Sequence, residues 1–113
     1  MMAGAAEDFA CRFFGVYSAK IADGLDAGWD LTLRDGRRVD VKWTPRDDGH
    51  LLCDMESKSK AEVFLLVVGE DPSDFLIAGW ASRDRLFSSV INLGHGDTFG
   101  LAQADLAPLD ELL

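Results

Sequence analysis

Residues 28–43 read GWDLTLRDGRRVDVKW, and this stretch decides how the chain is expected to fold. Apolar and polar residues alternate over residues 29–33 and again over residues 38–43, which is the pattern of two half-buried strands. Between them, Asp35-Gly36 is a common turn signal. The stretch therefore predicts a β-hairpin.

The register of this hairpin decides which carboxylates share a face of the sheet. A two-residue turn puts Asp30 opposite Val41, so that Asp30 and Asp40 face opposite sides. A three-residue loop over residues 34–36, with Gly36 left-handed in a bulge, puts Asp30 opposite Asp40 instead. We predict the second register, because only this one lets the two aspartates share a metal site without bending the strand.

The rest of the chain supplies the other elements of a mixed α/β domain. Apolar residues recur at helical spacing over residues 3–17, which predicts an amphipathic helix. Residues 63–68 (VFLLVV) are typical of a strand buried on both faces, residues 75–80 of a further strand, and Ser82 is placed to cap a short helix. We expect one domain over residues 1–113, with a central mixed β-sheet flanked by helices.

Several segments have weaker patterns. Residues 18–28 are rich in Gly, Asp and Ala and are interpreted as a loop. A short strand is favoured at residues 50–53, extended structure at 98–101 and a helix at 106–113. The sequence leaves open whether the tail from Leu93 docks on its own chain or on a partner.

Charge argues against a protein that coats DNA without specificity. The net charge is −9, whereas binding to the phosphate backbone relies on Lys and Arg. Five of the eleven basic residues nevertheless fall within residues 34–46, and the chain from Asp97 onward has four acids and no Lys or Arg. A local basic strip on an acidic body is still compatible with a phosphate backbone.

Composition predicts a cytoplasmic protein without a membrane span. No apolar run approaches the roughly 20 residues that a transmembrane helix needs. Residues 1–14 contain acids and no basic region of the kind that opens a signal peptide. Cys11 and Cys53 lack the spacing of a metal site, which is typical of buried, reduced thiols.

An acid on the first helix, Asp30 on one predicted strand and Asp40-Val41-Lys42 on the next follow a known pattern. With this pattern, the chain resembles the PD-(D/E)xK nuclease superfamily, in particular its small bacterial or phage members, over about residues 4–87. Trp29 stands where the family has proline. The resemblance implies a restriction-endonuclease-like or Holliday-junction-resolvase-like core, with residues 88–113 as a C-terminal extension.

The resemblance also implies metal-dependent hydrolysis of phosphodiesters. Asp30, Asp40 and Glu7 would bind Mg²⁺ or Mn²⁺, with the Val41 carbonyl as a further oxygen ligand. Lys42 would orient or help deprotonate the attacking water and stabilise the charge that develops on the phosphate. Asp8 is a close rival of Glu7 as the helix acid, so that choice stays open.

DNA is the expected partner, in phage or bacterial DNA processing or recombination by analogy with the family. The basic residues expected to contact it are Arg38, Arg46, Lys58 and Lys60, although a solvated loop is the more ordinary interpretation of the two lysines. A chain of this size covers little DNA, which makes a symmetric homodimer a reasonable expectation.

Two other functions stay open at this point. The same fold can serve as a catalytically inactive module for protein interaction or regulation, which the charge of −9 favours modestly. The second function is that of an acidic protein that mimics DNA and blocks a DNA-binding partner. His50 follows a polar loop and could approach the site, but a loop histidine is the more ordinary interpretation.

Overall fold

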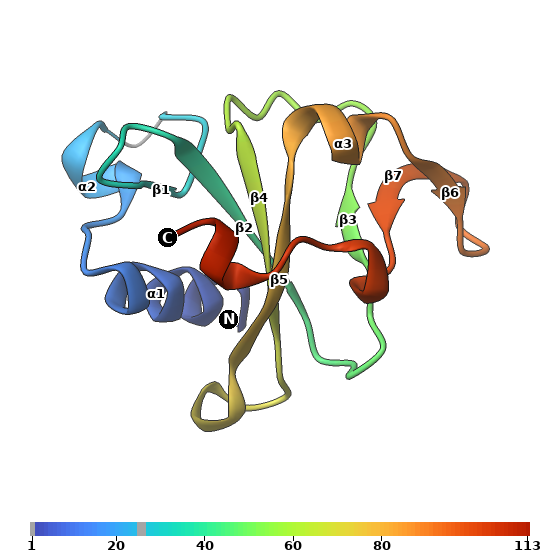
Figure 1. Cartoon of the computed structure of the whole chain (residues 1–113), viewed down its shortest axis with the longest axis horizontal. Helices are drawn as coiled ribbons and strands as arrows, with labels where there is room; N and C mark the ends of the chain where they lie inside the picture. The colour runs from blue at the N-terminus through green and yellow to red at the C-terminus, as the bar shows by residue number, and fades with distance from the viewer. Residues whose placement is uncertain (1, 25–26) are drawn as a thin grey trace.

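The structure is a computed structural model that describes residues 2–24 and 27–113. Helix α1 (Met2–Phe14) covers one face of a four-stranded sheet, and a smaller three-stranded sheet lies on the other face together with helix α3 (Arg83–Phe87) (Figure 1). The predicted mixed α/β architecture is confirmed. The covering layers differ from the prediction, because α1 covers one face of the sheet and a second sheet occupies most of the other.

The first sheet has the order β1-β2-β4-β5. β1 (Leu31–Thr32) and β2 (Arg38–Thr44) are antiparallel, β2 and β4 (Val63–Val68) are parallel, and β4 and β5 (Leu76–Ser82) are antiparallel. The sheet is therefore mixed, and the DxK segment of β2 lies next to its most buried strand.

The second sheet has the order β3-β7-β6 and is antiparallel throughout. β3 (Leu51–Cys53) and β7 (Asp97–Leu101) correspond to the two weak strand patterns in the sequence, whereas β6 (Val90–Asn92) was not predicted. The short helix α3 begins as predicted at Ser82, whose side chain accepts the backbone N–H of Arg85 at 3.2 Å.

Two of the weaker predictions are wrong. The segment expected as a loop over residues 18–28 contains a single helical turn, α2 (Ala19–Ala22). The helix expected over residues 106–113 is only one 3₁₀ turn, η3 (Leu109–Glu111), because the chain first pairs with β5 through Ala107 in an extended conformation. Two further 3₁₀ turns are η1 (Pro72–Asp74) and η2 (Gln103–Asp105).

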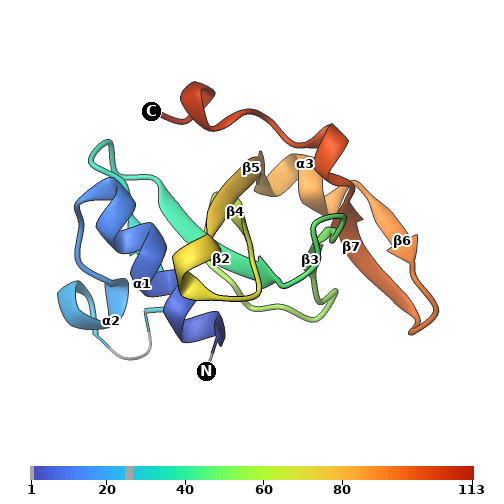
Figure 2. The same ribbon diagram turned by 90° about the horizontal axis from the view of Figure 1, so that it is seen from below.

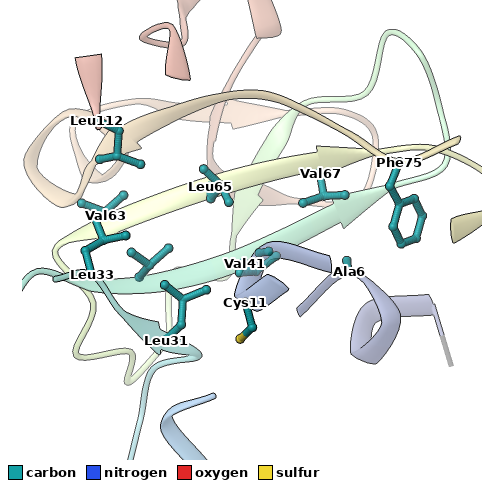
Figure 3. Close-up of a cluster of buried hydrophobic side chains, with 12 residues drawn as sticks. Ala6, Cys11, Leu31, Leu33, Val41, Val63, Leu65, Val67, Phe75 and Leu112 are labelled. Carbon is teal, nitrogen blue, oxygen red and sulfur yellow. The ribbon is translucent and has the colours of Figure 1, made fainter. Parts of the chain in front are cut away.

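Strand β4 is the centre of the molecule and is buried on both faces, as its continuous apolar run predicted. Alternate side chains of β4 pack against α1 on one face and against the second sheet and α3 on the other. Figure 3 shows the first of these clusters, in which Leu65 and Val67 lie on the sheet and Ala6 and Cys11 come from α1. The residues of β4 that face α1 are Val63, Leu65 and Val67, and those that face the second sheet are Phe64, Leu66 and Val68.

The hairpin has the register that we predicted. Leu31 pairs with Val39 and Thr32 with Arg38, while Gly36 adopts a left-handed φ of 96° in the turn. The paired part of β1 is shorter than expected, however, because the ladder ends at Leu31. Among residues 2–24 and 27–113, no strand therefore pairs with this edge of β2 from its third residue onward.

The C-terminal tail docks on its own chain. It passes β5, where Trp80 and Ala107 form a bridge, and ends beside the hairpin (Figures 1 and 2). There the Leu112 side chain is buried in the core under α1, and its carbonyl accepts a hydrogen bond from Arg37 Nη2 at 2.9 Å. Within residues 2–24 and 27–113, none of the helices has the length and apolar character needed to cross a membrane.

Candidate functional site at the edge of strand β2

Asp30 immediately precedes β1, and its side chain bonds to the open edge of β2. Its Oδ2 accepts the backbone N–H of Val41 at 2.7 Å, while its own N–H donates to the Val39 carbonyl at 2.9 Å. Its carbonyl accepts the N–H of Ala19 at 2.8 Å. Asp30 is thus fixed by the backbone of β2 and by the backbone of Ala19. Its carboxylate occupies the position where a longer β1 would have continued the ladder.

The surroundings of Asp30 favour its protonated form. Burial, together with the charge of Glu7 and hydrogen bonding between the two carboxyl groups, raises the pKa of Asp30 to about 6. The hydrogen bond from Val41 and the charge of Lys42 act in the opposite direction. Two carboxyl groups that meet in a partly desolvated place repel each other when both are ionised.

Glu7 is the helix acid that the structure brings to Asp30. It is half-buried on α1, whereas Asp8 is exposed and pairs with Arg12 at 3.0 Å. Burial, followed by the charges of Glu7 and Asp30, raises the pKa of the nearby Cys11 thiol. Of the two acids that the sequence left as rivals, Glu7 is therefore the one at the site.

Asp40 lies on β2 and is held from the face of the sheet opposite α1, so the two aspartates do not share a face as the predicted register was expected to arrange. Its side chain is 8% exposed, and its Oδ2 accepts a hydrogen bond from the hydroxyl of Ser59. Burial raises the pKa of Asp40, as does the charge of Asp30, while the Ser59 hydrogen bond and the charges of Lys42 and Arg83 lower it.

Ser59 and Arg83 are partners of Asp40 that the sequence did not reveal. Ser59 Oγ also accepts the N–H of Ala61 at 3.1 Å, and Arg83 Nη1 donates to the carbonyls of Ser59 and Ala61 at 2.7 and 3.0 Å. The guanidinium of Arg83 lies 4.6 Å from the centre of the Phe87 ring. The sequence offers no signal for this arrangement, because it joins a polar loop to a helix 24 residues later.

Lys42 lies within electrostatic reach of both aspartates, since its charge lowers the pKa of each. It is half-exposed and lines a hollow of about 430 Å³ that continues along β2 toward Arg46 and His50. Both the predicted lysine and Arg46 therefore border the same open space.

The remaining basic candidates have different surroundings. Arg38 is engaged within the chain: its Nε donates to Glu62 Oε1 at 2.8 Å, and its guanidinium lies 5.3 Å from the centre of the Trp29 ring. Lys58 and Lys60 are exposed in the loop before β4, and the Lys60 stem passes close to Gly28. These three residues do not line the hollow beside Lys42.

The structure thus places Asp30 within electrostatic reach of Glu7, Asp40 and Lys42. It does not gather the acids tightly: in the described part of the chain, no three His, Cys, Asp or Glu side chains are close enough together to hold a metal ion. Asp40 is turned toward Ser59, whereas Asp30 and Glu7 meet at the open edge.

Comparison with family models, with curated proteins and with solved structures finds no significant match for this chain.

Proposed function

We propose that this protein is a Mg²⁺- or Mn²⁺-dependent endonuclease that hydrolyses DNA phosphodiester bonds, built on a restriction-endonuclease-like core. The observation that carries the proposal is the hydrogen bond from Val41 N–H to the Asp30 carboxylate. It holds one acid at an open strand edge beside Glu7, next to Asp40 and within reach of Lys42. Acids that repel one another near a single lysine form a charge pattern that a divalent cation relieves.

The oxygen donors at this edge suit a hard cation, which takes one or two carboxylates together with other oxygens. Asp30 and Glu7 supply the carboxylates, and a turn of the Asp40 side chain away from Ser59 would add a third. The Val41 N–H points toward Asp30, and the N–H and carbonyl of a strand residue point to the same edge. The Val41 carbonyl is therefore directed to the side of the sheet where β1 has ended.

A bound divalent ion would supply neutralisation of the scissile phosphate and a water of lowered pKa. The chain's own groups would supply the rest. The Lys42 ammonium donates hydrogen bonds and carries positive charge, so it suits the orientation of the attacking water and the stabilisation of the charge that builds on the phosphate oxygens. Glu7 and Asp30 would hold the ion at the edge of β2.

Cleavage assays test this proposal directly. Labelled single-stranded, duplex, flap and four-way-junction DNA are incubated with the protein in Mg²⁺, Mn²⁺ or EDTA. We expect metal-dependent cutting that falls by roughly 100-fold or more in Lys42→Ala, as for the loss of other groups that stabilise a transition state. Lys20→Ala, an exposed lysine on α2, is the matched control and should cut normally.

Equal cutting by wild type and Lys42→Ala would assign the activity to a contaminant. If no substrate is cut, the proposal that this protein is an endonuclease is overturned. If duplex is the substrate, both strands must be reached, and a homodimer with two sites would supply this. Sedimentation of the protein with and without duplex DNA measures its oligomeric state.

A catalytically inactive module that binds another protein is the second candidate. The burial of Asp40 and its hydrogen bond to Ser59 favour it, because in this conformation Asp40 is not turned toward Asp30 and Glu7. The two functions differ in their response to metal: an endonuclease site is stabilised by Mn²⁺, whereas an inactive scaffold shows no change in melting temperature.

A further inference from the structure

The hollow next to Lys42 has no role in the hydrolysis proposed above. It has a volume of about 430 Å³, within the range of roughly 300–1,000 Å³ found for ligand pockets. Among its lining residues are Lys42 and Thr44 on β2, Arg46 and His50 on the loop that follows, and Leu52 and Leu93 on its apolar side. The hollow thus begins at the proposed catalytic lysine and extends away from it.

The loop that forms one wall is held in place. The Gln103 side-chain amide donates to the carbonyls of Asp47 and Gly49, each at 2.8 Å. Gly49 is buried against Thr44 so closely that an added Cβ would lie 2.3 Å from Thr44 Oγ1. A wall fixed in this way is already formed before a ligand arrives, so binding does not have to order it.

The charges in the hollow suit a single phosphate. Lys42 and Arg46 are cations and Asp48 is an anion, which leaves a formal charge of +1 with His50 neutral. Arg46 Nε lies 3.6 Å from Asp48 Oδ1, but both side chains are about four-fifths exposed, at 76% and 84%. An exposed pair of this kind is weak, so Arg46 is available to an incoming phosphate.

The apolar side of the hollow suits the flat face of a base. Leu52 is 38% exposed and Leu93 is 51% exposed, although both are large apolar residues. Apolar side chains next to cationic ones match the two parts of a nucleotide, since a base offers an apolar face and its phosphate a negative charge.

We propose that this hollow seats an unpaired nucleotide of the DNA strand on which the Asp30–Lys42 site acts. The base lies against Leu52 and Leu93, and its phosphate contacts Arg46 and Lys42. A base within a duplex is stacked and paired, so it must leave the helix before it can enter such a space. The substrate is therefore single-stranded or flapped DNA rather than continuous duplex. The choice of DNA rests on the proposed function, but the binding itself requires no catalysis.

Binding without cleavage tests this inference. The fluorescence anisotropy of labelled oligo-dT and of a labelled duplex of equal length is measured in EDTA. We expect oligo-dT to bind at least ten-fold more tightly than duplex. Arg46→Ala and Leu93→Ser should each weaken oligo-dT binding by five-fold or more, whereas Arg85→Ala and Leu76→Ser, at exposed positions elsewhere, should not. Melting curves confirm that each variant is folded.

Salt dependence gives a second measurement on the same samples. One or two phosphate contacts to a single strand predict a slope of log K against log salt between about −0.7 and −1.4. Equal affinity for oligo-dT and duplex, or wild-type binding by Arg46→Ala and Leu93→Ser, would overturn the inference. If oligo-dT binds selectively but no DNA is cut, only the proposed endonuclease activity is rejected. If DNA is cut but oligo-dT and duplex bind equally well, only the proposed nucleotide-binding hollow is rejected.

Discussion

The Asp30 carboxylate takes the place of a backbone carbonyl in the sheet, because its Oδ2 accepts the Val41 N–H at 2.7 Å just beyond the last β1–β2 pair, Leu31–Val39. A side chain that satisfies a strand edge also blocks its pairing with another strand. The same contact fixes the carboxylate beside Glu7. The structural role and the proposed chemical role of Asp30 therefore depend on a single hydrogen bond.

The first prediction concerns the pH dependence of stability. The pKa of Asp30 is raised from 3.8 to about 6 in the folded protein, so the folded state holds this proton more tightly than the unfolded chain does. The stabilising effect of that proton is fully present below about pH 3.8 and is lost as the pH rises through 6. We expect Asp30→Asn, whose amide oxygen can still accept the Val41 N–H, to be more stable than wild type at pH 7.5 by about 1–2 kcal/mol.

Urea denaturation at pH 4 and pH 7.5 measures this difference. The advantage of Asp30→Asn should shrink at pH 4, where wild type is largely protonated. Asp35→Asn is the control, because the exposed Asp35 is held by Arg37 and its pKa is lowered rather than raised. A variant that is less stable than wild type at both pH values would contradict a raised pKa at Asp30.

The second prediction concerns divalent metal. If Asp30 and Glu7 bind Mn²⁺, a metal concentration of 100 times Kd stabilises the fold by about 2.7 kcal/mol. For a domain of this size that is a rise in melting temperature of roughly 10 °C. Glu7→Gln should abolish most of the rise and Asp8→Asn should not, since Asp8 is paired with Arg12. Identical melting curves for wild type with and without Mn²⁺ would count against a metal site.

The sequence predicted the features that depend on neighbouring residues. The apolar run of β4 indicated burial on both faces, Asp35-Gly36 indicated the turn of the hairpin, and Ser82 indicated the start of α3. In each of these cases the deciding interaction lies within a few residues, so its pattern is visible in a short window.

The features that the sequence missed depend on distant residues. The pairing of β3 with β7 joins segments about 50 residues apart, and Ser59 reaches Asp40 from a loop without a pattern of its own. Asp30 was expected inside a strand, but Gly28 with a φ of 90° and the bond from Ala19 turn the chain just before β1. Tertiary contacts of this kind override local preference.

The third prediction concerns Ser59, which links Asp40 to the backbone of its own loop. Ser59→Ala removes the donor to Asp40 and the acceptor for Ala61 N–H, which leaves two buried groups without partners. We expect a loss of about 1–3 kcal/mol in the free energy of unfolding. Ser89→Ala is the comparison, because it is a partly exposed serine for which no side-chain hydrogen bond is found in the described structure. Equal stability of the two variants would show that Ser59 does not hold Asp40 in solution.

The last prediction uses two neighbouring leucines of the tail. Leu112 is 3% exposed in the core under α1, whereas Leu113 is 76% exposed. Leu112→Ala should therefore cost about 2–4 kcal/mol, as a buried leucine does when it leaves a cavity, and Leu113→Ala should change the stability by less than about 0.5 kcal/mol. Chemical denaturation of both variants compares positions that differ in burial but not in residue type. Similar values would show that the tail is not docked, because burial of Leu112 is what joins it to the hairpin and α1.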